Sequence, residues 1–398
     1  MLYWIYCSAK FVLSRRWECS HIHQALNGRS PFYLLELVMN RYARVTFLVA
    51  LAVSLSALFG PIALAQEKKS FKVGYSLYVG FIPFVWMQQS GVMKKWADKY
   101  GIDVELILVN DYVGSVNQLI AGELDAVGVA GMDALTMPAA GGVDTTVFLI
   151  TDYSNGNDAI VSKTAKSVAE LAEKEVFLLQ YSVSHYLLNR ALVLNDLPGV
   201  GALTTTNISD SEVSAAFLSQ PSLEHVVSWK PMVSDMLAGA SGSTVVFDSS
   251  KIPGEIMDVF VGKTETLQAN PELGKALTGA WYETLAAMNA DGPEGKQVRT
   301  VLASAMGTDL AGLKSQTDTT FFFNTPAEAA AFLSSPKTKE IWDYVRTFSF
   351  EQGLFGQGAA SVDAIGIEFA DKSVLGDAAN IKLRVDASFA ALGAEGKL

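Results

Sequence analysis

The chain of 398 residues has very little cysteine, and this shortage excludes several kinds of chemistry. Its two cysteines, Cys7 and Cys19, both lie near the N-terminus. No disulfide, thiolate metal site or cysteine nucleophile can therefore form in the rest of the chain. The sequence also lacks the Gly-x-Ser-x-Gly, His-Glu-x-x-His and Walker motifs, which excludes the common signatures of hydrolases, metalloproteases and nucleotide-binding enzymes.

Residues 39–65 have the composition of a secretory signal peptide. They begin with a short basic segment, continue with an almost uncharged apolar run over 45–58, and end in the small-residue cleavage pattern Ala63-Leu64-Ala65. We therefore predict a cleaved signal and export to the periplasm. No cysteine follows the cleavage pattern, so lipid attachment at that point is excluded.

A membrane anchor is the alternative interpretation of the same segment. Its apolar run is shorter than the ~20 residues that span a bilayer, and Gly60-Pro61 interrupts it before the cleavage pattern. Residues 1–38 precede the signal. Because a signal peptide acts from the N-terminus, we predict that Met39 is the true start and that residues 1–38 are a mis-assigned extension with no structural role.

Basic residues are also scarce. Removing residues 1–65 takes away six of the 30 Lys and Arg residues and two of the 41 Asp and Glu residues, so the net charge of −11 becomes about −15. An acidic chain without basic clusters argues against nucleic-acid binding. The remaining arginines are Arg190, Arg299, Arg346 and Arg384. None of the four lies in a loop that is predicted to follow a strand.

Strand-length and helix-length patterns alternate after residue 70. Strands are predicted at 71–76, 102–109, 124–130 and 145–150, and helices at 84–100, 115–121 and 134–140. This alternation predicts an α/β unit with a parallel sheet and helices on both faces. Ligands of such sheets bind beyond the carboxyl ends of the strands, where we predict a polar loop at 151–158.

A second, smaller α/β unit is predicted further along the chain. Its strands are expected at 176–179, 226–228 and 244–247, and its helices at 185–194, 209–217 and 232–238. A strand at 256–261 and a long helix at 272–288 follow it. Residues 351–395, rich in Gly and Ala, are interpreted as a tail that wraps the first unit.

The chain resembles the periplasmic solute-binding proteins of ABC importers, in the group that binds nitrate, sulfonates, taurine and thiamine precursors. The segments that carry the resemblance are KVGYSLYVGFIPFVWMQQSGVMKKW, AGELDAVGVAGMDAL, SVSHYLL, SWKP and NPELGKALTGAWYETLAAM. It implies a two-lobed, type II-like fold, each lobe a mainly parallel sheet with helices on both faces, and a ligand cleft between the lobes. Lobe 1 is expected at 66–160 plus 255–398, and lobe 2 at 161–254.

The resemblance extends to the subfamily found beside urea-carboxylase-type enzymes. The matching segments are NDYVGSVNQ, GMDALTMPAAGGVDTT, DYSNGND, SVSHYLL and FDSSKIPGEIMD. This implies uptake of urea, guanidine or a similar amide, with an ABC permease and ATPase as partners, no cofactor and no metal. We expect a monomer. Lys230 departs from the pattern, because a neutral polar residue is expected after Trp229; it either faces the ligand or extends outward.

The charge of the ligand can be predicted from the residues themselves. The predicted rim loops carry Asp111, Asp133, Asp152, Asp158, Glu255 and Asp258 and no arginine. Carboxylates that converge on a small cleft repel each other unless a cation or N–H donors satisfy them. An anion would need the cationic donors that this rim lacks. The sequence therefore predicts a cationic or donor-rich ligand.

The predicted ligand-binding residues are Tyr78, Phe81, Asp111, Met132, Asp133, Asp152, Tyr153, Asp158, Ser182, Ser184, His185, Trp229, Glu255 and Asp258. Structural roles are open for each of them. Asp111 and Asp133 fit helix caps, and the aspartates of the 151–158 loop fit Asx turns. His185 fits either a ligand donor or a structural position, and each aromatic residue fits a cleft wall or the core. Of Glu255 and Asp258, we expect one to face the ligand.

An enzyme is the main alternative from another functional class, because thiamine-pyrimidine synthases resemble these binders. Those enzymes use a cysteine-rich segment and histidine chemistry. Beyond residue 65 this chain has no cysteine and only two histidines, His185 and His225. We therefore predict a binding protein with no catalytic residues. A subunit that presents solute to a membrane receptor is a third possibility, which the sequence does not separate from transport.

Overall fold

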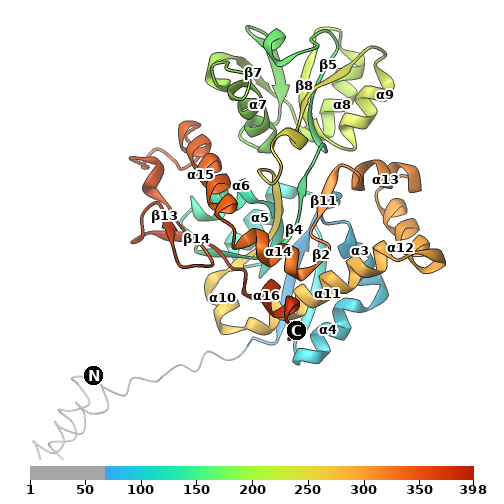
Figure 1. The fold of residues 1–398 in the computed structure, drawn as a ribbon, viewed down its shortest axis with the longest axis vertical. Coiled ribbons are helices and arrows are strands. Elements are labelled where there is room, and N and C mark those ends of the chain that lie inside the picture. Colours follow the sequence, from blue (N-terminus) through green and yellow to red (C-terminus); the bar gives the residue numbers. More distant parts are fainter. Residues whose placement is uncertain (1–67) are drawn as a thin grey trace, which may run out of the picture. The chain divides into compact units, whose positions relative to one another are not determined.

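The computed structural model describes residues 68–398, so the predicted signal peptide and N-terminal extension lie outside the described residues. Within 68–398 the strands form two sheets, one of nine strands and one of five. We call the larger sheet with its helices lobe 1 and the smaller sheet with its helices lobe 2. Figure 1 shows lobe 2, coloured green to yellow, above lobe 1. This is the predicted two-lobed α/β architecture.

The strands of lobe 1 are β1 (Ser70–Tyr75), β2 (Asp103–Leu108), β3 (Ala126–Ala130), β4 (Thr145–Ser154), β10 (Met257–Lys263), β11 (Thr320–Phe322), β12 (Gly366–Glu368), β13 (Val374–Leu375) and β14 (Ile381–Val385). Their order across the sheet is β13-β12-β14-β4-β10-β3-β1-β2, with β11 paired to β4 off this path. The longer helices are α3 (Pro83–Ser90), α4 (Val92–Tyr100), α5 (Tyr112–Ala121), α11 (Pro271–Asn289), α12 (Gly292–Ala305) and α15 (Pro336–Glu351). Shorter ones are α6 (Gly131–Ala134), α10 (Thr264–Ala269), α13 (Leu310–Thr317), α14 (Pro326–Leu333) and α16 (Ser388–Ala394).

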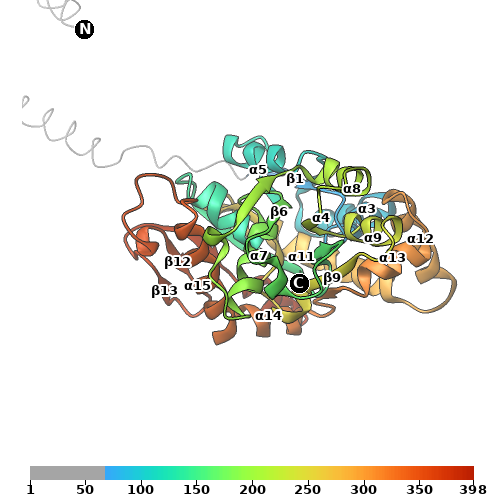
Figure 2. The ribbon, with the colours of Figure 1, turned by 90° about the horizontal axis from the view of Figure 1, so that it is seen from above.

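Lobe 2 contains β5 (Asp158–Ser162), β6 (Glu175–Leu178), β7 (Thr204–Asn207), β8 (His225–Trp229) and β9 (Thr244–Asp248). Their order is β7-β6-β8-β5-β9. The sheet is covered by α7 (Val183–Val193), α8 (Asp210–Ser219) and α9 (Met232–Gly239). Figure 2 shows that α15 with β12 and β13 lies to one side of these elements, and α12 with α13 to the other.

Local sequence explains several element boundaries in lobe 1. All five residues of β3 are buried, as expected for a central strand with both faces covered. The predicted helix at 84–100 is two helices, because Gly91 adopts a left-handed conformation (φ 79°) between α3 and α4. The predicted helix at 134–140 is the short α6 followed by a π-helical turn, Leu135–Ala139, that contains Pro138.

Each sheet is mainly parallel, as predicted, and contains a minority of strands that run the other way. In lobe 1, β10 runs antiparallel to both β3 and β4. In lobe 2, β5 runs antiparallel to β8 and β9. The physical reason is the path of the chain, since β4 leads directly into β5 and β9 leads back into β10.

The chain crosses between the sheets at 155–157 and returns at 249–256. The two crossings are joined side by side, because the Ser154 and Ser249 hydroxyls lie 2.7 Å apart and the Gly156 N–H donates to the Ser249 hydroxyl. The lobe boundary predicted after residue 160 falls inside β5. The segment DYSNGND, predicted as a loop, instead contains the end of β4 and the start of β5.

Each side of the lobe 1 sheet has a buried core. One cluster contains Phe84, Phe260 and Trp281, with the Phe84 and Phe260 rings stacked at 4.4 Å between centroids. The predicted C-terminal tail contributes to lobe 1 as strands, since β14 pairs in parallel with β4. None of the helices in residues 68–398 combines the length and apolarity needed to span a membrane.

Candidate functional site

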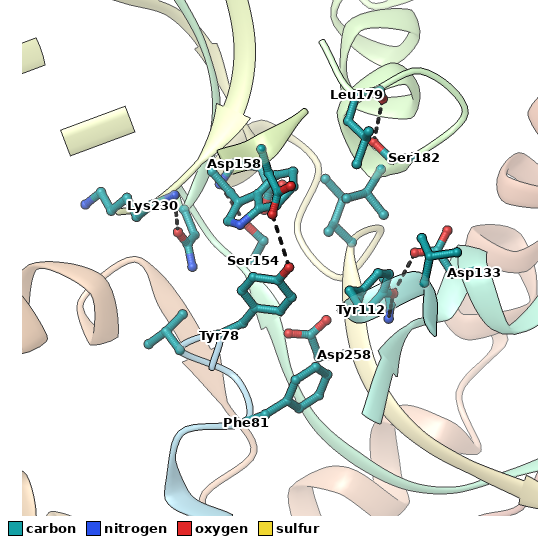
Figure 3. A pocket seen from close by; sticks show the side chains of 18 of the residues that line it. Tyr78, Phe81, Tyr112, Asp133, Ser154, Asp158, Leu179, Ser182, Lys230 and Asp258 are labelled. Carbon is teal, nitrogen blue, oxygen red and sulfur yellow. Dashed lines mark hydrogen bonds between the residues drawn. The ribbon is translucent and has the colours of Figure 1, made fainter. Parts of the chain in front are cut away.

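A cavity of about 370 Å³ lies between the two lobes. Lobe 1 and the crossings line it with Tyr78, Val79, Phe81, Asn110, Asp111, Tyr112, Val113, Ala130, Asp133, Asp152, Ser154, Asn157, Ile256 and Asp258. Lobe 2 lines it with Asp158, Leu179, Ser182, Val183, Asp210, Ser211, Trp229 and Lys230. Its volume is that of a small-molecule site. Figure 3 shows the side chains from both lobes facing the same space.

Four aspartates that line the cavity come from the strands and helix beside the crossings. Asp152 on β4 and Asp258 on β10 stand directly opposite each other in an antiparallel pair, so their side chains project from the same face. Asp158 begins β5, and Asp133 lies in α6. Asp133, Asp152 and Asp158 are buried, with exposed fractions of 7%, 2% and 6%.

These four carboxylates have hydroxyl partners or none, and no ion pair involves any of them within residues 68–398. The Tyr112 hydroxyl donates to Asp133 Oδ2 at 2.6 Å, and the Thr151 hydroxyl donates to Asp152 Oδ2 at 2.8 Å. Buried charges are ordinarily paired. The arrangement therefore leaves negative charge in the cavity that protons or a ligand must balance.

Burial raises the pKa of all four carboxyls, because it penalises the charged form. The pKa rises to about 6 for Asp133, about 7 for Asp152 and about 6 for Asp158. The pKa of Asp258 lies well above its ordinary value, first through burial and then through repulsion by Asp152 and the other two aspartates. Near neutral pH these carboxyls therefore retain part of their protons, which a cationic ligand would displace.

Aromatic rings form a second part of the cavity wall. The Tyr78 ring meets the edge of the Trp229 ring from lobe 2 at 5.9 Å, and lies 5.8 Å from the Tyr112 ring. The Tyr78 hydroxyl donates to Asp210 of lobe 2 at 3.4 Å. Phe81 is almost fully buried and packs edge-on against Phe260 below the cavity. Such walls can hold a planar ligand by its faces.

Lys230 is the only Lys or Arg among the described residues that line this cavity. Its ammonium donates to the Ser315 carbonyl of α13 at 2.9 Å, so it links lobe 2 to lobe 1 and forms no ion pair with a cavity aspartate. In Figure 3 the side chain extends away from Asp258. Burial lowers the pKa of this ammonium. The four arginines beyond residue 65 do not line the cavity either.

Nine of the predicted site residues line the cavity: Tyr78, Phe81, Asp111, Asp133, Asp152, Asp158, Ser182, Trp229 and Asp258. Two of them also cap helices, since Asp111 accepts from the Gly114 N–H at the start of α5 and Ser182 accepts from the Ser184 N–H at the start of α7. Asp133 does not cap α6, whose N-cap is Ala130.

Tyr153 and Met132 were also predicted to bind the ligand, but the structure places both away from the cavity. Side chains of a strand alternate between faces, so Tyr153 projects opposite to Asp152. It stacks on Phe321 at 4.6 Å between ring centroids. Met132 is buried in the lobe 1 core.

Three more residues that were predicted to bind the ligand do not line the cavity: Ser184, His185 and Glu255. His185 lies in the contact between α7 and α15, where its ring packs edge-on against Phe348 at 5.6 Å between centroids, and Ser184 is fully buried outside the cavity lining. Burial lowers the pKa of His185 to about 4, which keeps it neutral. Glu255 accepts two hydrogen bonds from the Arg190 guanidinium, at 2.7 and 2.9 Å.

Sequence reasoning missed several polar residues of the cavity. Tyr112 follows Asp111 directly and holds Asp133 in place, while its own oxygen accepts from the Ala130 N–H at 2.9 Å. Asn157 lies in the first crossing and accepts from the Lys230 N–H at 3.0 Å. Asp210 opens α8 and meets Tyr78. Both Tyr112 and Asn157 lie inside segments that carried the family resemblance, which was the available signal.

No metal-binding arrangement of three or more His, Cys, Asp or Glu residues is present within residues 68–398. The polar and aromatic side chains that line the site are six aspartates, aromatic rings, amide and hydroxyl groups, and Lys230. Chemically, it can accept N–H donors and balance positive charge.

The fold is similar to those of solved periplasmic binding proteins. The aliphatic sulphonate binding protein SsuA of Escherichia coli matches with a TM-score of 0.59 at 18% identity, covering 73% of this chain and 94% of that one. SsuA of Xanthomonas axonopodis, solved with MOPS, gives 0.58 at 15% identity over 75% and 99%. The nitrate-binding protein NrtA of Synechocystis PCC 6803 gives 0.50 at 13% identity over 83% and 99%. These likenesses show a shared fold.

A search of curated protein sequences gave no significant match. A family model does match, over residues 64–303, which include all of lobe 2 and most of lobe 1. The matched region contains every carboxylate of the cavity and both crossings between the lobes. The chain belongs to the NMT1-like family.

Proposed function

We propose that this protein is the solute-binding component of an ABC importer, which captures a small solute in the periplasm and delivers it to a membrane permease and its ATPase. The family, the two-lobed fold and a small-molecule cavity between the lobes support this proposal. The predicted signal peptide is consistent with the location. Closure of the lobes around a ligand is the usual mode of such folds.

The proposed ligand is a small cationic or donor-rich nitrogen compound, and guanidinium is the preferred candidate over urea. The observation that carries this choice is the set of four cavity carboxylates without a basic partner in residues 68–398. A neutral ligand can donate hydrogen bonds to the four carboxylates but does not reduce the repulsion between their negative charges. A planar cation with N–H donors along its edges donates hydrogen bonds and also neutralises the negative charge, and a carboxylate receives such an edge through two parallel N–H···O bonds.

Proton exchange follows from the raised pKa values of the four aspartates. A bound cation favours their ionised forms, so binding releases protons when the pH lies near or below about 7. Affinity for a cation should therefore increase as pH rises from 5 to 8, while affinity for neutral urea should change less. This difference separates the two nitrogen compounds in one titration.

A second candidate is an oxyanion, such as a sulfonate or nitrate. Its support is the fold comparison, in which the solved proteins are described as sulphonate-binding and nitrate-binding. Lys230 is the basic residue available to the cavity for such a ligand. Several raised-pKa carboxyls would have to stay protonated to receive an anion, so the charge of the site favours the cation.

A thiamine-pyrimidine precursor is the remaining binding candidate, and synthesis of such a compound is the enzymatic one. Both follow from the resemblance of this group of binders to thiamine-pyrimidine synthases. The lack of cysteine beyond residue 65 disfavours the enzyme, which would need its cysteine-rich segment. A binding protein predicts stoichiometric uptake without turnover.

The test is a calorimetric screen of the purified protein against guanidinium, urea, short amides, nitrate, taurine and thiamine precursors. A ligand at a hundred times its Kd stabilises the folded state by about 2.7 kcal/mol, which a thermal shift also detects. Stoichiometric binding of guanidinium without product formation is the expected result. Binding of nitrate or taurine but not of guanidinium or urea would overturn the proposed ligand, and turnover would overturn the proposed role.

A further inference from the structure

Gly80, in the loop between β1 and α3, lies against two of the cavity carboxylates. A Cβ atom built on Gly80 would come within 3.0 Å of Oδ2 of Asp152 and of Oδ2 of Asp258, a separation that real Cβ atoms essentially never show. The two carboxylates thus converge on the space that the missing side chain leaves open. Asp152 lies on β4 and Asp258 on the neighbouring strand β10, and Gly80 lies against both carboxylates.

Backbone conformation does not explain this glycine. Many glycines of the chain adopt positive φ values that only glycine tolerates well, and Gly91 and Gly122 are examples. Gly80 is not among them, so other residues can adopt its backbone conformation. What a larger residue at this position would meet is the end of two aspartate side chains, not backbone. The space for the carboxylates is therefore the reason for glycine here.

The Asp152–Asp258 pair is the least compensated part of the cavity. Like charges directly opposite on adjacent strands repel, and the Asp258 side chain has no hydrogen-bond donor among the described residues. Figure 3 shows the Asp258 carboxylate directed into the space between Tyr78 and Tyr112. A cation beside the pair can contact both carboxylates at once, because the two Oδ2 atoms both lie within 3.0 Å of one point, the Cβ position built on Gly80.

We propose that Gly80 is a positioning residue for ligand charge: by having no side chain, it lets Asp152 and Asp258 converge and bind one cationic group together. The inference rests on the proposed function and adds to it the two-carboxylate subsite and the residue that sets its geometry. The chemical class it selects is a planar cation with N–H donors along more than one edge, since each carboxylate can receive one edge through N–H···O bonds.

Other titratable groups face this pair and contribute to its pH response. They are Asp158 on β5, Asp133 on α6, Tyr112 on α5 and Tyr78 in the same loop as Gly80. If a side chain at position 80 pushed Asp152 and Asp258 apart, the two carboxylates would keep these neighbours but could no longer contact one cation together. Affinity for the cation should then fall, and its dependence on pH should weaken, while the fold remains.

The test is the Gly80→Ala variant with Gly201→Ala as the matched control. A Cβ at Gly201 has no atom within 4 Å, and its φ is not positive, so the control adds the same methyl group without a conflict. Calorimetry gives the Kd for guanidinium and for its neutral isostere urea between pH 5 and 8. Gly80→Ala should weaken guanidinium at least tenfold at pH 8, reduce the guanidinium-to-urea ratio and flatten the pH profile. Gly201→Ala should match the wild type.

A background without the two carboxylates separates positioning from misfolding. In Asp152→Ala/Asp258→Ala, adding Gly80→Ala should change neither the thermal midpoint nor residual ligand binding, because the conflict is gone. Should Gly80→Ala alone fail to fold, rescue in this background supports the proposal and lack of rescue overturns it. Equal guanidinium affinity in Gly80→Ala and wild type would overturn it while leaving the proposed function intact. A wild type that binds oxyanions and no cation overturns both.

Discussion

Two carboxylates near the end of the return crossing, Glu255 within it and Asp258 at the start of β10, have opposite environments. Glu255 accepts two hydrogen bonds from Arg190 and one from the Tyr186 hydroxyl, so its charge is paired. Asp258, three residues later, has a like-charged neighbour, Asp152, and no basic partner in residues 68–398. Within four residues, the charge of Glu255 is neutralised by Arg190, whereas the carboxylate of Asp258 lines the cavity without a basic partner among the described residues. The comparison separates a structural carboxylate from one that is available to a ligand.

The largest effect should come from removing the partner of the paired carboxylate. Arg190→Met leaves Glu255 buried and uncompensated, which should lower the free energy of unfolding by about 3–5 kcal/mol. Chemical denaturation at pH 7.5 measures the loss. The control is Arg346→Met, whose partners Asp343 and Asp363 are exposed, and we expect about 1 kcal/mol or less there. Equal losses in the two variants would remove the distinction drawn for Glu255.

The unpaired carboxylates should make the ligand-free protein less stable as pH rises. Their folded pKa values, about 6 to 7, exceed the ordinary value of 3.8, so the folded state holds protons that the unfolded state has lost. This contribution to stability is therefore full below about pH 4 and is lost as the pH rises to about 7, by about 3–4 kcal/mol for each group. Denaturation curves across this range measure it. His185 acts in the opposite direction, so the share of Asp152 is the difference between wild type and Asp152→Asn.

Neutralising Asp258 should lower the affinity for a cation and raise the free energy of unfolding. Asp258→Asn removes one half of the pair at nearly constant shape, so guanidinium should bind with a loss of about 2 kcal/mol, or roughly thirtyfold. Urea should lose less, because it carries no charge, and the unfolding free energy without ligand should rise at pH 8. Calorimetry and denaturation on the same preparation give both numbers. A variant that loses both ligands equally would indicate a geometric role for Asp258.

The smallest effect should follow the loss of the basic residue beside the cavity. Lys230 bonds Ser315 instead of an aspartate, so Lys230→Met should change guanidinium affinity by less than about 1 kcal/mol. An oxyanion ligand predicts the reverse, a large loss of nitrate or sulfonate binding. Calorimetry with both ligand classes checks this, and a large effect would favour the oxyanion.

The broad architecture was predictable from the sequence because it depends on local patterns. The alternation of strands and helices, the cap at Ser182 and the breaks at glycines are short-range signals, and they place the aspartates near strand ends. The charge of the site was also predictable, since it required only counting which polar residues follow the strands. The structure brings Asp133, Asp152, Asp158 and Asp258 to one cavity.

The failures arose where tertiary contacts decide. The polarity of DYSNGND indicated a loop, but pairing with β10 and β11 extends β4 through Ser154. Successive side chains of a strand point to opposite faces, so Tyr153 lies on the face away from the cavity. Glu255 and His185 were displaced by partners distant in sequence, Arg190 and Phe348. No local pattern marks such partners, and the same holds for the contact between Gly80 and the two carboxylates.

Near its end, β4 has one face in the cavity lining and the other face in an aromatic cluster. Asp152 and Ser154 face the cavity, whereas Tyr153 lies in a cluster of aromatic rings formed with Phe321, Phe323 and Phe332 on the other side. Because Tyr153 packs on the face opposite to Asp152 and Ser154, a substitution at either cavity residue should leave the aromatic cluster in place. The cavity side chains of this strand can thus be varied singly without disturbing the packing that anchors the strand.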